Sequence, residues 1–83
     1  MKRAQRFAFN ELKKMGVPVF ERSDYPDTFL ISAEQSNSSD WAYYYSERPD
    51  WIFGVNPLID KALRKRGLFA EWETPGALIV FEG

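Results

Sequence analysis

The chain of 83 residues contains neither cysteine nor histidine. The absence of cysteine excludes disulfide bonds, a thiol nucleophile and a thiolate metal site, and it is compatible with the reducing cytoplasm, where we expect the protein to reside. The absence of histidine removes the commonest general base and the commonest metal ligand. No apolar run approaches the ~20 residues that span a bilayer, so we expect a soluble domain with no membrane partner.

Sequence motifs typical of catalysis are also lacking. The chain has no phosphate-binding P-loop, no glycine-rich dinucleotide turn, no nucleophile elbow and no metal-ligand spacing. An enzyme would have to rely on carboxylates, of which Glu71 and Glu73 share one face of an expected strand. Because strand carboxylates two apart usually form a solvated face, a carboxylate–metal enzyme is the weakest of three functional hypotheses. The sequence predicts no catalytic residue, no metal ligand and no cofactor.

Aromatic residues are abundant, with seven phenylalanines, four tyrosines and three tryptophans. Residues 1–83 suffice for a single domain, in which folding hides only about 60–65 % of the chain's surface and leaves a thin core. Large aromatic side chains compensate for that small core. Six of them are concentrated in one short segment: Trp41, Tyr43, Tyr44, Tyr45, Trp51 and Phe53.

The charges are sorted by segment, although the formal net charge is only −1. Nine of the eleven lysine and arginine residues lie in Lys2–Met15 and Asn56–Arg66, whose net charges are +4 and +3. The rest of the chain carries −8. An asymmetry of this kind can orient a binding partner.

Both basic segments have the pattern of amphipathic helices. In Lys2–Met15 and again in Asn56–Arg66, apolar residues recur every three or four positions and form one stripe. Asn56 is a favoured N-cap, and Pro57 suits the first helical position. A glycine follows each segment and suits a left-handed C-terminal cap.

Strand-like segments occupy the remainder of the chain. The best candidates alternate or are rich in β-branched and aromatic residues, and they are Val17–Arg22, Thr28–Glu34, Trp41–Ser46, Leu68–Glu73 and Ala77–Glu82. Thr28–Glu34 alternates cleanly and is expected to be half-buried. Trp51–Val55 is apolar and extended. The tripeptide Thr74-Pro75-Gly76 suits a type II turn that joins the last two strands into a hairpin.

Two amphipathic helices and four to five strands require one common core. They predict an α+β fold, with an antiparallel sheet of four to five strands, both helices on one face and the order α-β-β-β-α-β-β. The segment Leu63–Leu68 resembles Leu12–Val17, 51 residues earlier, and each precedes two strands joined by a proline-containing turn. The resemblance indicates either an αββ pseudo-repeat or shared local rules of helix termination.

The polar helix faces suggest a site for nucleic acid or another polyanion. Its residues would be Arg3, Arg6, Lys13, Lys14, Lys61, Arg64, Lys65 and Arg66. Five of these eight lie in last helical turns, where cations offset the helix dipole in any protein. Domains that bind phosphates are usually basic overall, whereas this chain has a net charge of −1. Nucleic acid is therefore the less favoured partner.

The sheet face opposite the helices must meet water or a partner. We predict that Phe20, Tyr44 and Trp72 form an interface on that face, with Val19 and Phe69 as alternatives to the first and the last. Aromatic residues there could also stack nucleic-acid bases or simply fill the core. The favoured prediction is a non-catalytic protein-binding domain that associates with itself as a homodimer, because a second copy commonly covers an open sheet edge.

Overall fold

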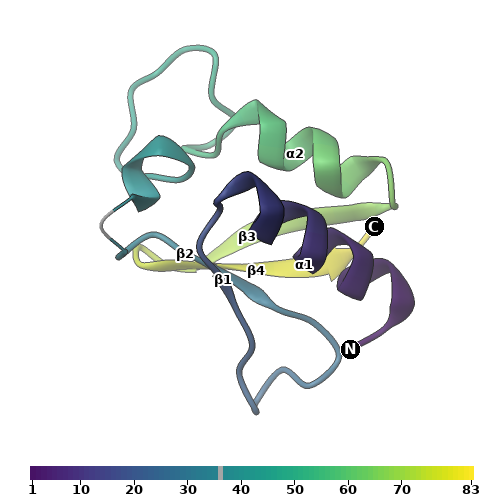
Figure 1. Ribbon diagram of the computed structural model, residues 1–83. Helices are drawn as coiled ribbons and strands as arrows, with labels where there is room; N and C mark the ends of the chain where they lie inside the picture. Colours follow the sequence, from purple (N-terminus) through teal and green to yellow (C-terminus); the bar gives the residue numbers. More distant parts are fainter. Residues whose placement is uncertain (36) are drawn as a thin grey trace.

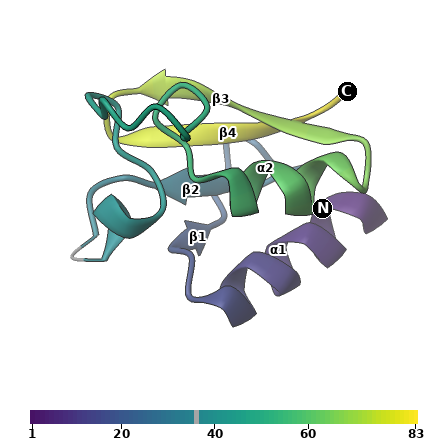
Figure 2. The same ribbon diagram turned by 90° about the horizontal axis from the view of Figure 1, so that it is seen from above.

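The computed structural model of the chain describes residues 1–35 and 37–83. Helices α1 (Arg3–Met15) and α2 (Pro57–Arg64) lie on one face of a four-stranded antiparallel sheet with the strand order β1-β2-β4-β3 (Figures 1 and 2). The strands and a short 3-10 helix are β1 (Val19–Phe20), β2 (Leu30–Ser32), η1 (Ser38–Asp40), β3 (Leu68–Thr74) and β4 (Ala77–Glu82). The predicted α+β fold with both helices on one face is confirmed.

The predicted caps are confirmed at the end of α1 and at the start of α2, but not at the end of α2, where Lys65 and not Gly67 is the C-cap. At the end of α1, Gly16 is left-handed with φ of 94°, and the Val17 N–H donates to the Leu12 carbonyl at 3.0 Å, which is a Schellman arrangement. At the start of α2, the Asn56 side chain accepts a hydrogen bond from the Leu58 N–H at 2.9 Å. Helix α2 ends two residues before the predicted boundary, and a turn follows it.

The main core fills the space between the helices and the sheet. Its fully buried side chains include Leu12 of α1, Ile59 and Leu63 of α2, Ile31 of β2, Leu78 and Val80 of β4, and Phe29 just before β2. The Phe9 ring packs edge-to-face against Phe29, with 5.4 Å between the ring centroids. This contact connects α1 directly to the middle of the sheet.

The sheet face opposite the helices carries a second, smaller apolar cluster. Its buried members are Leu30, Ala77 and Ile79. Phe20 and Tyr25 pack over them. The expectation of a half-buried strand at Thr28–Glu34 is therefore wrong, because the loop between β1 and β2 brings Tyr25 over the second face of β2.

The segment between η1 and α2 forms no strand of the sheet. We predicted a strand at Trp41–Ser46 and an extended segment at Trp51–Val55, and both predictions are wrong. Only two isolated bridges, Ala42 to Val55 and Ile52 to Val55, are found within this described segment. A tight turn after Trp51 folds the chain back at once, so the two sides are too short for a ladder.

Strands β3 and β4 form the predicted hairpin around Pro75-Gly76. The predicted type II turn is wrong, because Gly76 lacks the positive φ that this turn needs at its second central position. Gly76 instead leaves room for the Glu34 carboxylate, which an added Cβ atom would touch. The register shifts between Trp72 and Thr74, which places a bulge at the end of β3.

The strand order is symmetric about the middle of the sheet. Each helix is followed by an antiparallel hairpin, and β2 and β4 pair antiparallel at the centre. Two αββ units related by an approximate two-fold axis would give this arrangement. The symmetry agrees with the αββ pseudo-repeat, which is one of the two interpretations of the sequence resemblance.

Candidate functional site

A dense group of exposed aromatic side chains lies on residues 41–55, which we call the aromatic insert (the loop at the upper left of Figure 1). The insert folds back through a turn at Ile52–Val55, whose end residues exchange backbone hydrogen bonds of 3.0 and 2.9 Å. The central residues, Phe53 and Gly54, have φ of 49° and 82°. Positive φ at both central positions is the geometry of a type I′ turn. Phe53 thus has a left-handed backbone conformation that bulky residues rarely adopt.

Trp72 of β3 fixes the insert to the sheet. The Trp72 indole N–H donates to the Phe53 carbonyl at 2.7 Å, and the Tyr44 ring packs edge-to-face on Trp72 with 5.2 Å between centroids. The Tyr43 N–H donates to the Gly54 carbonyl at 2.8 Å. An added Cβ atom at Gly54 would collide with the Tyr43 carbonyl oxygen. The turn is therefore held from two sides.

The turn presents its side chains to solvent. Phe53 is 89 % exposed and Tyr45 is 66 % exposed. We define the aromatic insert surface as Tyr43, Tyr44, Tyr45, Ile52, Phe53 and Trp72. A cavity of about 50 Å³ lies at its base, and its lining includes Phe53, Trp72 and three residues of α2, Ile59, Asp60 and Leu63. Contiguous apolar patches of this kind often mark interaction sites, whereas single exposed hydrophobic residues do not.

Carboxylates are frequent in and next to the aromatic insert. Asp40, Glu47 and Asp50 are exposed in or next to the insert, and Asp60 lines the cavity. The single cation within residues 41–55 is Arg48, whose guanidinium lies over the Trp51 ring at 4.7 Å. Residues 40–60 therefore combine exposed aromatic side chains with four carboxylates and a single cation.

The three predicted interface residues do not share one sheet face. Tyr44 and Trp72 contact each other at the insert. Phe20 lies on the face opposite the helices, as predicted, whereas Trp72 packs on the helix side. Phe69, the alternative to Trp72, is the aromatic residue of β3 on the open face, where its ring lies 5.6 Å from that of Phe81.

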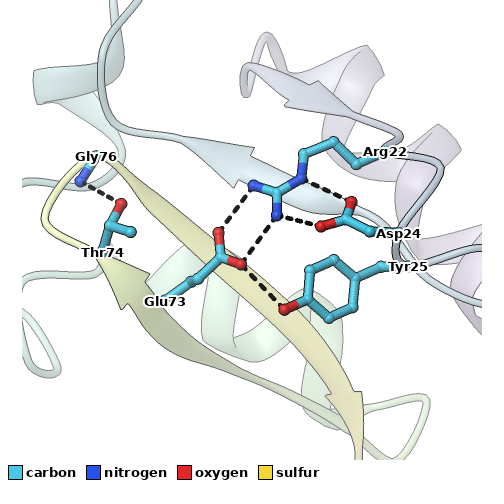
Figure 3. Close-up of polar contacts among 6 residues, drawn as sticks. All are labelled: Arg22, Asp24, Tyr25, Glu73, Thr74 and Gly76. Atoms are coloured by element: carbon cyan, nitrogen blue, oxygen red, sulfur yellow. Dashed lines mark hydrogen bonds and ion pairs between the residues drawn. The ribbon is translucent and has the colours of Figure 1, made fainter.

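A compact ion-pair network lies on the open face (Figure 3). The Arg22 guanidinium donates to Asp24 at 2.9 and 2.7 Å and to Glu73 at 2.9 and 3.0 Å, and the Tyr25 hydroxyl donates to Glu73 at 3.0 Å. The hydrogen bonds that Asp24 accepts from Arg22 hold the pKa of the Asp24 carboxyl below its ordinary value. The hydrogen bond that the Tyr25 hydroxyl donates to Glu73 raises the pKa of Tyr25. The network fastens the loop between β1 and β2 to β3.

The carboxylates of Asp24 and Glu73 thus lie close together on this face, but both are paired with the Arg22 guanidinium. Of the two strand carboxylates considered for an enzyme, Glu73 meets Asp24 through Arg22, and Glu71 is exposed elsewhere on β3. Among residues 1–35 and 37–83, no group of three or more acidic side chains is placed to hold a metal ion.

Half of the predicted polyanion-binding residues have acidic partners within the chain. The ion pairs are Arg6 with Glu21, Arg64 with Asp60, and both Lys65 and Arg66 with Glu11. The other four residues are exposed, and they are Arg3, Lys13, Lys14 and Lys61. Pairing with carboxylates weakens the positive field that the helix faces would offer to phosphates.

Glu11 connects the two helices, because it accepts from Lys65 at 2.9 Å and from Arg66 at 2.7 Å. The hydrogen bond from Lys65, followed by the one from Arg66, lowers the pKa of Glu11. Because the pKa of Glu11 is lower in the folded state than in the unfolded state, its ionisation stabilises the fold at pH values above the unfolded-state pKa of about 4.5. This contribution is lost as the pH falls through the folded-state pKa.

We therefore expect Glu11→Gln to lower the free energy of unfolding at pH 7 by up to about 1 kcal/mol, which is typical of a partly exposed ion-pair cluster. Urea denaturation at pH 7 and pH 3 measures the effect, and the difference between wild type and variant should shrink at pH 3. Glu47→Gln on the exposed insert is the control, with little change at either pH. A Glu11→Gln effect that is the same at both pH values would contradict this assignment.

Within the described part of the chain, no helix is both long and apolar enough to cross a bilayer. Comparisons with models of protein families, with curated proteins and with solved structures find no match for this chain. Function must therefore be argued from the chemistry of the surface.

Proposed function

We propose that the protein is a non-catalytic protein-binding domain and that the aromatic insert surface binds its partner. The observation that carries the proposal is the 89 % exposed ring of Phe53 at a left-handed backbone position. That conformation costs a non-glycine residue roughly 1–2 kcal/mol, and a ring in water gains no packing energy in return. Strain of this kind accumulates at functional sites, so a partner that covers Phe53 explains both features.

The insert is also suited to binding by its rigidity. Tyrosine and tryptophan provide large contact areas with few rotatable bonds, as they do in antibody loops. Tyr44 packs edge-to-face against both Tyr45 and Trp72, at centroid distances of 5.1 and 5.2 Å. Because these rings are already ordered in the free protein, less entropy is lost when a partner binds. The cytoplasm is the location that we propose for this binding, since the chain contains no cysteine.

The acidic surroundings indicate the chemistry of the partner. A protein segment with an apolar anchor flanked by lysine or arginine would bury the anchor against Phe53 and pair its cations with the exposed carboxylates of the insert, Glu47 and Asp50. Its cations could also lie over the tyrosine rings. A nucleic-acid backbone would meet repulsion from the same carboxylates. The proposed partner is therefore a basic, partly apolar protein segment.

Selection of peptides from a random phage-displayed library tests the proposal. We expect the enriched peptides to combine basic residues with an aromatic or aliphatic anchor. Phe53→Gly should weaken their binding at least 30-fold, which is roughly the effect of losing a 2 kcal/mol hot spot. Glycine favours the left-handed conformation, so this variant should be at least as stable as the wild type. Fluorescence anisotropy of a labelled peptide measures the affinity.

Phe7→Ala provides the matched control, because Phe7 is a 50 % exposed phenylalanine on α1 and not on the insert. Its peptide affinity should equal that of the wild type. Undiminished binding by Phe53→Gly would overturn the proposal, as would a library that yields no enriched peptide. The polyanion hypothesis would be supported instead if the protein bound a single-stranded oligonucleotide in a salt-sensitive way and if Lys13→Gln and Lys14→Gln weakened that binding.

A further inference from the structure

Strand β3 has seven residues, forms an outer edge of the sheet and pairs with β4 alone (Figure 2). The direction of its backbone groups follows from its neighbours. The Val80 N–H of β4 donates to the Phe29 carbonyl, on the side of β2. Hydrogen-bonding directions alternate along a strand, so Ala70, which lies opposite Val80, turns its N–H and C=O away from β4. The same alternation turns the backbone groups of Leu68 outward.

These outward groups make no further backbone hydrogen bond within the described part of the chain. The far end of β3 is occupied, because Trp72 contacts the insert. The free part of the edge is therefore Leu68–Glu71. The opposite edge of the sheet, β1, has only two residues and follows Pro18, which are common protections against edge pairing. Strand β3 is thus the edge that is open to another strand.

The order of charges along the chain selects the occupant of this edge. Arg64 and Lys65 precede the free segment, and their side chains remain 68 % and 53 % exposed in their ion pairs with Asp60 and Glu11. Glu71 lies exposed at the end of the segment. Arg66 and Glu73 are more fully engaged within the chain, by Glu11 and Arg22. Antiparallel pairing of two such strands brings the basic end of each beside the acidic end of the other. Parallel pairing would bring like charges together, which is destabilising. The segment is therefore complementary in charge to a reversed copy of itself.

We propose that two copies of this protein pair antiparallel through β3, with the two-fold axis at Phe69. In this register the outward N–H and C=O groups of Leu68 and Ala70 bond to those of Ala70 and Leu68 in the second copy. Phe69 then faces its own copy in a close, non-hydrogen-bonded pair, where aromatic side chains stabilise each other. The result is a closed dimer with a continuous eight-stranded sheet, four strands from each copy.

The absence of cysteine from the chain permits a direct test with single-cysteine variants. Phe69→Cys would place two Cα atoms about 4.5 Å apart, within the range of a disulfide. Mild oxidation should therefore convert most of this variant to a covalent dimer on a non-reducing gel. Phe81→Cys is the matched control, from the same residue type on the same face. In the dimer its Cα atoms are three strand spacings, roughly 14 Å, apart, and it should remain a monomer on the gel.

Ala70→Pro tests whether blocking the β3 edge prevents dimer formation. Proline removes an N–H that β4 does not use, so the monomer should fold with an unchanged circular dichroism spectrum while pairing is blocked. In sedimentation equilibrium the wild type should have twice the monomer mass and Ala70→Pro the monomer mass. If Ala70→Pro does not fold, the cysteine pair decides alone.

A wild type that sediments as a monomer at millimolar concentration would overturn the proposed dimer. A dimer retained by folded Ala70→Pro would also overturn it, as would a Phe69→Cys variant that cross-links no faster than Phe81→Cys. None of these results affects peptide binding at the insert, because the test there changes Phe53, which is outside the β3 edge.

Discussion

Replacing Phe29 with alanine is expected to remove a large fraction of the protein's stability. The Phe29 side chain is fully buried and packs against Phe9 at the centre of the main core. Truncations of this kind cost about 3–5 kcal/mol. At about 0.05–0.15 kcal/mol per residue, a chain of this length has a total stability of roughly 4–12 kcal/mol. Urea denaturation followed by circular dichroism should therefore show a midpoint near zero or far below that of the wild type.

The control for this substitution makes the same chemical change at Phe7, which is 50 % exposed on α1. A surface truncation there should change the free energy of unfolding by no more than about 0.5 kcal/mol. A loss of less than about 1 kcal/mol in Phe29→Ala would contradict the central position of Phe29 in the core.

Gly54→Ala is expected to detach the aromatic insert from the sheet. Alanine in a left-handed conformation costs roughly 1–2 kcal/mol. Contact of the new Cβ atom with the Tyr43 carbonyl adds about 1–3 kcal/mol and separates the two backbones. The hydrogen bond from the Tyr43 N–H to Gly54 should break, so hydrogen exchange of the Tyr43 amide should accelerate and peptide binding should be lost.

Gly16→Ala separates the cost of the left-handed conformation from the cost of the contact with the Tyr43 carbonyl. Gly16 has φ of 94°, but no atom lies within 4 Å of an added Cβ at that position. Its replacement should therefore carry only the conformational cost and leave the exchange of the Tyr43 amide unchanged. Equal losses of stability in Gly16→Ala and Gly54→Ala would show that the close approach of Tyr43 to Gly54 does not restrain the insert.

The fold could be predicted where neighbouring residues decide the structure. Gly16 and Asn56 cap their helices through groups a few residues away, and the stripes of α1 and α2 require burial on one side. The β3–β4 hairpin has a short loop, so its two strands find each other locally. These features depend on local geometry, which the sequence carries directly.

The remaining features depend on contacts between distant segments. Burial of the second face of β2 requires Tyr25, which a hydrogen bond to Glu73, 48 residues away, helps to hold in place. The side on which Trp72 lies follows from the register of β3, and its partner Phe53 is 19 residues earlier. Gly54 is the local signal of the turn at Ile52–Val55. The alternation of Trp51 and Phe53 resembles the pattern of a strand, so the sequence predicts an extended segment there. Exposure of Phe53 could not be inferred from its hydrophobicity.

The distribution of tryptophan gives this protein an unusual optical property. Trp41 and Trp51 lie in the aromatic insert, and Trp72 is the residue that fixes the insert to the sheet. Intrinsic emission therefore originates almost wholly at one end of the molecule, whereas circular dichroism follows the helices. A shift of the emission spectrum during heating would record release of the insert and not melting of the helices. The two spectroscopic midpoints would then differ wherever the insert opens while the rest of the domain remains folded.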